Sequence, residues 1–127
     1  MFRVESYKVK KGYMIITKFE EIIAWQKAKM LTMDIYRTLG YCRDYSFRDQ
    51  IQRASISIMN NIAEGFERRT NKEFINFLFI AKGSSAEVRS MLYPALELQY
   101  ISKNKFDEWY LLTVEISRLL SGFIKTL

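Results

Sequence analysis

The residues with the greatest potential for chemistry recur at steps of three or four positions along one predicted helix. They are Arg53, Ser57, Asn61 and Glu64. This spacing places their side chains in a line on one helical face. Such a line is informative where it is buried, because buried polar groups need hydrogen-bond partners. Where it faces water it is an ordinary solvated flank, and the sequence leaves both interpretations open.

Two carboxylates offer the one catalytic arrangement that the chain suggests. Glu64 and Glu87 can meet across two predicted helices and act as a general acid and base. Nothing in the sequence organises a substrate around them, so we predict no catalytic activity. The better interpretation is a hydrogen-bonded polar seam that fixes register and partner choice, and we hypothesise that it lies at a contact between copies of the chain. Its expected members are Ser57, Asn61, Glu64, Ser84 and Glu87, with Arg53 or Arg89 as a further member.

Other familiar catalytic and metal-binding patterns are missing from the sequence. The chain contains no histidine, which removes the Glu-x-x-His motif of helical bundles, the usual zinc ligand and the commonest general base. Cys42 is the single cysteine, so it has no intrachain disulfide partner and makes no metal site alone. There is no glycine-rich phosphate loop. We therefore expect no enzyme activity, no cofactor, no metal and no small-molecule substrate.

Four long helices must position these residues. One proline and five glycines among 127 residues leave few breaks, which favours long helices. Apolar stripes at helical spacing predict helices over about 19–39, 46–65, 71–100 and 103–127. The short links between them make sequential neighbours antiparallel. The sequence therefore predicts an all-α, up-down-up-down four-helix bundle over residues 19–127.

Local signals mark where the helices begin and break. The expected N-caps are Ser46 with Asp49, Thr70 with Glu73, and Ser102. Gly65 is expected to stop or bend the second helix, and Pro94 to kink the third without ending it. Gly83 lies inside the third helix, where glycine costs about 1 kcal/mol relative to alanine. We expect a packing reason for it, with tolerated weakness as the alternative.

Residues 1–18 differ from the remainder of the chain. They carry five basic residues and one acidic residue, whereas residues 19–127 carry 15 basic and 13 acidic residues. A basic arm can hold nucleic acid electrostatically. The apolar stretches on either side of Gly12 also suit a short hairpin. We predict a basic N-terminal extension that is either an arm or a hairpin.

Basic residues in three places are candidate contacts for RNA or DNA. They are Arg53, the cluster Arg68, Arg69 and Lys72, and the pair Lys10 and Lys11 in the extension. Acidic neighbours such as Glu67 and Glu73 interleave with the cluster, so local ion pairing is the alternative interpretation. Aromatic residues do not interleave with these clusters as they do in single-strand binders. We expect contact mainly with the nucleic-acid backbone and little sequence reading.

The expected location of the protein follows from three simple observations. No apolar stretch approaches the roughly 20 residues that a membrane span needs. The first residues lack the apolar centre of a signal peptide. A lone cysteine suits a reducing compartment. We expect a cytoplasmic protein without membrane contact.

Several motifs follow one another along the chain. They are Phe19-Glu20-Glu21, Trp25-Gln26-Lys27-Ala28 and Tyr36; Ser57-Ile58 and Asn61-Ile62-Ala63-Glu64-Gly65, followed by an arginine; Phe74, Phe77-Leu78, Ala81, Gly83-Ser84 and Glu87; and Leu119-Leu120-Ser121-Gly122 with Ile124. In this order the chain resembles the four-helix-bundle proteins encoded within ribosomal RNA intervening sequences. The resemblance implies a ring-like homo-oligomer, a pentamer. The resemblance also implies a distant relationship to a basic accessory protein of diversity-generating retroelements. That protein works with a reverse transcriptase and nucleic acid.

These features predict a non-catalytic, homo-oligomeric scaffold whose basic surface patches are candidate contacts for RNA or DNA. The alternative is a protein-binding adaptor with no nucleic-acid contact. A hydrolase that uses carboxylates is a third and disfavoured class.

Overall fold

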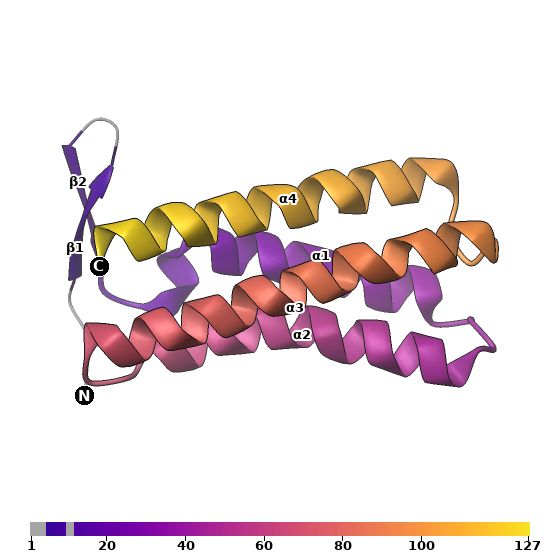
Figure 1. Ribbon diagram of the computed structural model, residues 1–127, viewed down its shortest axis with the longest axis horizontal. Coiled ribbons are helices and arrows are strands. Elements are labelled where there is room, and N and C mark those ends of the chain that lie inside the picture. Colours follow the sequence, from indigo (N-terminus) through magenta and orange to yellow (C-terminus); the bar gives the residue numbers. More distant parts are fainter. Residues whose placement is uncertain (1–4, 10–11) are drawn as a thin grey trace.

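Four long helices lie side by side along one axis in up-down-up-down order (Figure 1). A computed structural model of the chain describes residues 5–9 and 12–127. The helices are α1 (Ile23–Leu39), α2 (Tyr45–Phe66), α3 (Asn71–Glu97) and α4 (Lys103–Thr126). The prediction of an all-α four-helix bundle is confirmed. None of the helices in the described ranges has the length and apolarity to cross a membrane.

The start of α1 differs from the prediction by four residues. Phe19–Glu21 form a separate 3-10 turn, η1, and Ile22 is extended, with φ −73° and ψ 120°. Glu21 Oε1 accepts hydrogen bonds from the backbone amides of Thr17 at 2.8 Å and Lys18 at 3.2 Å, which closes this turn. The side chain of Ile22 is only 2% exposed. The local pattern predicts a helix from residue 19. Because Ile22 is extended and buried in the core, α1 begins only at Ile23.

The N-cap of α2 is Asp44, so the prediction of Ser46 is wrong. Asp44 Oδ1 accepts a hydrogen bond from a first-turn backbone amide at 3.1 Å. Its other oxygen accepts a hydrogen bond from the Tyr100 hydroxyl at 2.7 Å. Asp49, the expected partner of Ser46, forms an ion pair with Arg48 at 3.0 Å instead. The residue that caps α2 is therefore also held by a tertiary contact, the hydrogen bond from Tyr100 in the link after α3.

The caps of α3 and α4 are confirmed. Thr70 Oγ1 accepts a hydrogen bond from the Glu73 amide at 3.1 Å, and Glu73 Oε2 accepts one from the Thr70 amide at 3.3 Å. Ser102 Oγ accepts a hydrogen bond from a first-turn amide of α4 at 3.1 Å. As expected, α3 continues through Pro94, but it ends at Glu97, three residues before the predicted end.

Gly65 permits a close helix–helix contact and is not the C-cap of α2, although the helix ends within one residue of the predicted end. The helix runs through it to Phe66. A Cβ at Gly65 would lie 2.6 Å from Phe77 Cβ and 2.9 Å from Phe74 Cδ1. At Gly83 a Cβ would meet no atom of the described chain within 4 Å, so the expected packing reason is not found within one copy.

The core contains one stripe from each helix and a charged anchor between α1 and α4. Trp109 is fully buried, and its Nε1 donates a hydrogen bond to Asp34 Oδ2 at 2.7 Å. Lys105 Nζ donates to the same oxygen at 2.8 Å. Burial raises the pKa of Asp34, but the hydrogen bonds from Lys105 and Trp109 more than offset this, so the pKa lies below its ordinary value. The anchor therefore stabilises the charged carboxylate.

A hairpin precedes the bundle. Strands β1 (Glu5–Val9) and β2 (Gly12–Ile16) pair antiparallel, with Glu5 opposite Ile16 and Val9 opposite Gly12. The hairpin lies at the end of the bundle that holds the C-terminus, where β1 contacts α4 (Figure 1). The sequence left an arm or a hairpin open for the N-terminal extension, and the described strands form a hairpin. Lys10 and Lys11 lie outside the described residues.

Candidate nucleic-acid interface

The predicted polar seam forms in part, between α2 and α3. The Oγ atoms of Ser57 and Ser84 lie 2.9 Å apart. Asn61 Nδ2 donates to Ser57 Oγ at 2.9 Å and to the Ser57 carbonyl at 2.8 Å. All three residues are half-buried. The structure therefore brings these three predicted members together within one copy of the chain, where they join two neighbouring helices.

The two glutamates expected in the seam lie elsewhere. Glu87 Oε2 accepts a hydrogen bond from Gln50 Nε2 at 2.9 Å. Gln50 precedes Glu64 by fourteen residues in α2, which corresponds to about 20 Å of helix. Glu64 borders a shallow hollow together with Phe19 and Arg68. The two carboxylates do not meet, so the acid–base arrangement that the sequence suggested is not formed.

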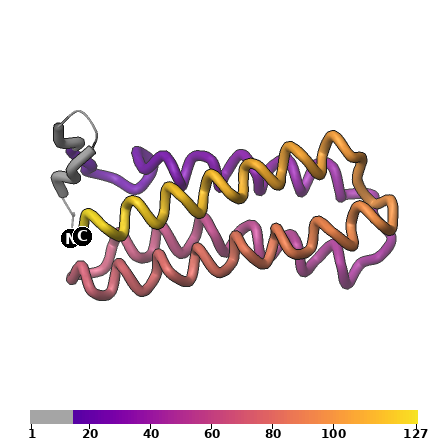
Figure 2. The backbone as a smooth tube through the Cα atoms, turned by 45° about the horizontal axis from the view of Figure 1, so that its top comes forward, coloured from indigo at the N-terminus to yellow at the C-terminus, as the bar shows by residue number. Residues whose placement is uncertain are grey.

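The predicted basic cluster lies on the turn between α2 and α3. Arg68, Arg69 and Lys72 are all exposed there. The guanidinium of Arg68 lies 4.7 Å from the centre of the Phe77 ring, which holds its charge against α3. Both views place this turn at the same end of the bundle as the C-terminus (Figures 1 and 2). Arg53 is exposed on α2, thirteen residues before the helix ends, which puts it about 20 Å from the cluster.

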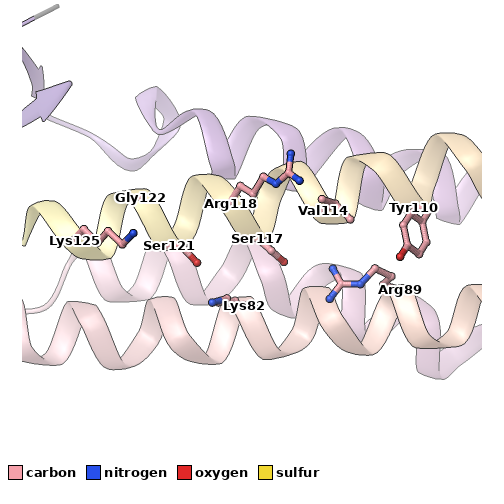
Figure 3. A pocket seen from close by; sticks show the side chains of 9 residues that line it. All are labelled: Lys82, Arg89, Tyr110, Val114, Ser117, Arg118, Ser121, Gly122 and Lys125. Atoms are coloured by element: carbon pink, nitrogen blue, oxygen red, sulfur yellow. The ribbon is translucent and has the colours of Figure 1, made fainter. Parts of the chain in front are cut away.

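A groove between α3 and α4 gathers four cations that were not among the predicted contacts. Lys82 and Arg89 come from α3, and Arg118 and Lys125 come from α4 (Figure 3). The groove has a volume of about 610 Å³. Figure 3 shows the hydroxyl group of Ser117 directed toward α3 in the space between the two helices. The groove therefore combines positive charge with hydrogen-bonding hydroxyl groups.

Two acidic side chains of the same helices are engaged on other sides of the bundle. Glu87 bonds to Gln50 of α2, and Glu115 Oε1 pairs with Lys27 Nζ of α1 at 3.0 Å. No carboxylate belongs to the described residues that line the groove. Within the described chain none of the four groove cations forms an ion pair within 4.0 Å. The positive charge of the groove is therefore not compensated by neighbouring carboxylates.

Small side chains set the register of α3 against α4. Ser85 Oγ donates a hydrogen bond to the Thr113 carbonyl at 3.0 Å, and Ser117 Oγ donates one to Ser85 Oγ at 3.3 Å. Ser85 and Thr113 are fully buried. Because the helices approach closely at this level, the long side chains of Lys82 and Arg89 lie beside the contact and line the groove.

A signal for the groove was present in the sequence. On each helix the two cations are seven positions apart, which is about two helical turns and places them on one face. The sequence did not show that the two faces meet. That step depends on the register between α3 and α4.

One end of the groove is aromatic. Tyr110 lines it, and the ring centre of Tyr93 lies 6.4 Å from that of Tyr110 and 5.3 Å from that of Phe106. Tyr93 remains 51% exposed. The neighbouring hydroxyl group of Tyr110 raises the pKa of Tyr93, whereas the charges of Arg89 and Lys103 act to lower it. The exposed ring of Tyr93 therefore lies near Arg89, one of the four cations of the groove.

A second groove, between α1 and α4, is richer in apolar side chains. Trp25, Met30, Met33 and Leu112 line it together with Gln26, Lys29, Asp34, Arg37 and Glu108. Met30 is 62% exposed and Met33 is 41% exposed. Exposed apolar side chains that gather in this way are typical of surfaces that bind another protein chain. This groove and the basic one lie on different sides of α4.

Comparisons with known proteins agree with the resemblance seen in the sequence. A family model described as 23S rRNA-intervening sequence protein matches residues 20–122. The chain is similar to a crystal structure from Bacteroides thetaiotaomicron VPI-5482, a protein with unknown function from the S23 ribosomal protein family, with a TM-score of 0.75 and 25% identity, covering 82% of this chain and 96% of that one. No curated protein matches the chain. Since the family model spans nearly the whole bundle, the chain belongs to the 23S rRNA-intervening sequence protein family.

Proposed function

We propose that the protein is a non-catalytic, homo-oligomeric scaffold that binds the phosphate backbone of RNA or DNA. The observation that carries this proposal is the groove between α3 and α4, where four cations gather without a carboxylate among the described lining residues. Lysine and arginine side chains bind phosphates by releasing condensed counterions, and this supplies affinity without reading sequence.

The basic cluster on the turn between α2 and α3 extends the same surface. Lys125 lies near the C-terminus, at the end of the bundle that also carries Arg68, Arg69 and Lys72 (Figure 1). We expect a strand that leaves the groove past Lys125 to reach these exposed cations. Arg53 lies apart from them on α2, so we expect it to contribute less to binding.

Assembly of several copies is the second part of the proposal. The apolar groove between α1 and α4 supports it, because exposed methionines in a hollow are suited to burial against another chain. The ring-like pentamer is the assembly that the resemblance seen in the sequence implies. Copies that meet through this side leave the basic groove open. Several weak phosphate-binding grooves on one assembly then act together by multivalency.

The non-catalytic part rests on the arrangement of the candidate groups. The chain has no histidine. Glu87 bonds to Gln50, and about 20 Å of α2 separates Gln50 from Glu64. General acid–base catalysis needs groups within hydrogen-bond reach of one reacting centre. This separation supports a binding role for the exposed surface.

A salt titration of nucleic-acid binding tests the proposal. The affinity should fall linearly on logarithmic axes, with a slope of about −0.7 per phosphate contact for single strands. The variant Lys82→Gln/Arg118→Gln should reduce the slope by about 1.4, because two contacts are lost. Its matched control is Lys29→Gln/Arg43→Gln, which removes the same charge from exposed positions away from the groove.

The outcomes of this titration separate the two functional classes. An equal loss in the control pair would assign binding to overall charge and count against the groove. Absence of binding at low salt, measured on the full chain, would leave the protein-binding adaptor. That alternative is favoured by the same apolar groove between α1 and α4. Analytical ultracentrifugation tests assembly separately, and a monomer at every concentration would contradict the homo-oligomer.

A further inference from the structure

We infer that the groove between α3 and α4 binds single-stranded nucleic acid in preference to duplex, with a base stacked on Tyr93 at its aromatic end. The inference rests on the proposed function and specifies the form of nucleic acid that the groove takes. It concerns a groove to which α3 and α4 both contribute cations, with aromatic rings from both helices at one end.

The ring of Tyr93 is held in place yet remains accessible. Its neighbours Phe106 and Tyr110 meet it edge to face, at interplanar angles of 74° and 88°. Those two rings lie nearly parallel to each other, at 24°. No ring of the described chain is stacked parallel on Tyr93, which is 51% exposed. A fixed and half-exposed ring can stack on a base while losing little conformational freedom.

The cations lead directly to this ring. Arg89 lines the groove and lies one helical turn before Tyr93 on α3, about 6 Å along the axis. Lys103 Nζ lies 4.9 Å from the ring centre of Phe106, which is itself 5.3 Å from the ring centre of Tyr93. A strand whose phosphates follow the groove cations therefore reaches Tyr93 with its next bases. Basic grooves that end on aromatic rings are typical of single-strand binders.

The preference for a single strand follows from the stacking step. In a duplex the bases are paired and stacked on one another, so their faces are not free to meet Tyr93. Duplex contact is then limited to phosphates and to the cations alone. The expectation of contact mainly with the backbone is extended here, because aromatic residues lie beside cations that were not among the predicted contacts.

Fluorescence anisotropy with labelled probes of about 12 nucleotides tests the inference, since single-strand sites span about 4–16 nucleotides. The probes are oligo(U), oligo(dT) and a duplex of mixed sequence, each titrated with the full chain. We expect single strands to bind about tenfold more tightly than the duplex. Tyr93→Ala should weaken single-strand binding about tenfold and leave duplex binding and the salt slope unchanged, because the lost contact carries no charge.

Matched variants separate stacking from structural effects. Tyr93→Phe keeps the ring and should bind as the native protein does, whereas Tyr93→Leu keeps apolar bulk for packing but lacks the ring and should resemble Tyr93→Ala. Tyr45→Ala removes a 61% exposed tyrosine that also has an arginine over its ring, but at the start of α2, and should have no effect. A probe containing 2-aminopurine should be quenched by the native chain and less by Tyr93→Leu.

Failure of this inference is distinguishable from failure of the proposed function. Equal affinities for single strand and duplex, or single-strand binding that is unchanged in both Tyr93→Ala and Tyr93→Leu, would overturn the inference and leave backbone binding intact. No binding of any probe at low salt overturns the proposed function itself. Binding of either oligo(U) or oligo(dT) that is weakened in both Tyr93→Ala and Tyr93→Leu supports the inference.

Discussion

Replacing Gly65 by alanine should destabilise the bundle, although alanine is the better helix former. Gly65 is buried inside α2 at the contact with α3. A Cβ there would lie 2.6 Å from Phe77 Cβ and 2.9 Å from Phe74 Cδ1. Ordinary carbon–carbon contacts are about 3.5–4.0 Å, so the two helices would have to separate by about 1 Å. Phe77 Cβ is attached to the α3 backbone, so a change of rotamer does not relieve the contact.

The expected magnitude combines two opposing terms. Alanine gains about 1 kcal/mol over glycine in helix propensity. Overpacking a core typically costs about 1–3 kcal/mol, and a contact between a Cβ and a backbone-linked Cβ belongs at the upper end. The net loss is then about 2 kcal/mol. At about 4 °C per kcal/mol for a domain of this size, the midpoint of thermal unfolding should fall by about 8 °C.

Gly83→Ala is the matched control. It makes the same chemical change in α3, but a Cβ at Gly83 meets no atom of the described chain within 4 Å. Only the propensity gain remains, so its midpoint should rise by about 2–4 °C. Thermal unfolding followed by circular dichroism at one fixed protomer concentration measures both variants, because assembly makes the midpoint depend on concentration.

The two variants should therefore shift in opposite directions. If Gly65→Ala were as stable as the native chain or more stable, the close approach of α2 and α3 would not require glycine at this position. If Gly83→Ala were destabilised and assembled less, Gly83 would face another copy, and the packing reason expected from the sequence would lie between protomers.

Three further predictions concern the anchor, the cap and the seam. Asp34→Asn should cost about 1–2 kcal/mol near neutral pH. A carboxylate with a lowered folded-state pKa contributes stability above its ordinary value of 3.8 and loses it as the pH falls through the lowered value, so urea unfolding should show native and variant chains converging in acid. Thr70→Ala removes the N-cap of α3 and should cost about 1 kcal/mol in the same assay, and no loss would mean that the capping box adds nothing. Asn61→Leu removes the donor to Ser57 and should alter the oligomer if the seam governs assembly, and an unchanged sedimentation coefficient would exclude that role.

The helices and their caps could be predicted well because their signals are local. Thr70 with Glu73 and Ser102 act through amides within one turn, so tertiary contacts need not be known. The predicted helix starts were wrong where contacts with residues distant in sequence determine the local structure. Asp44 caps α2 while it accepts a hydrogen bond from Tyr100, which lies 56 positions away. Ile22 breaks the first helix because its side chain is buried in the core.

The candidate interface could be predicted only in part. The basic turn at Arg68 and Arg69 was visible because its residues are neighbours in sequence. The four cations of the groove come from two helices, and their convergence depends on the contact between Ser85 and Thr113. The same dependence on register explains why Glu64 and Glu87 were expected to meet and do not.

The sequence by itself determined four amphipathic helices, their order and the family, because a 3.6-residue period and capping residues act within one segment. Only the tertiary structure decided which face of one helix meets which face of the next. That choice is made by close contacts between distant residues, such as Gly65 with Phe77 and Ser85 with Thr113. The basic groove exists because α3 meets α4 at Ser85 and Thr113, since each of these helices contributes two of its four cations.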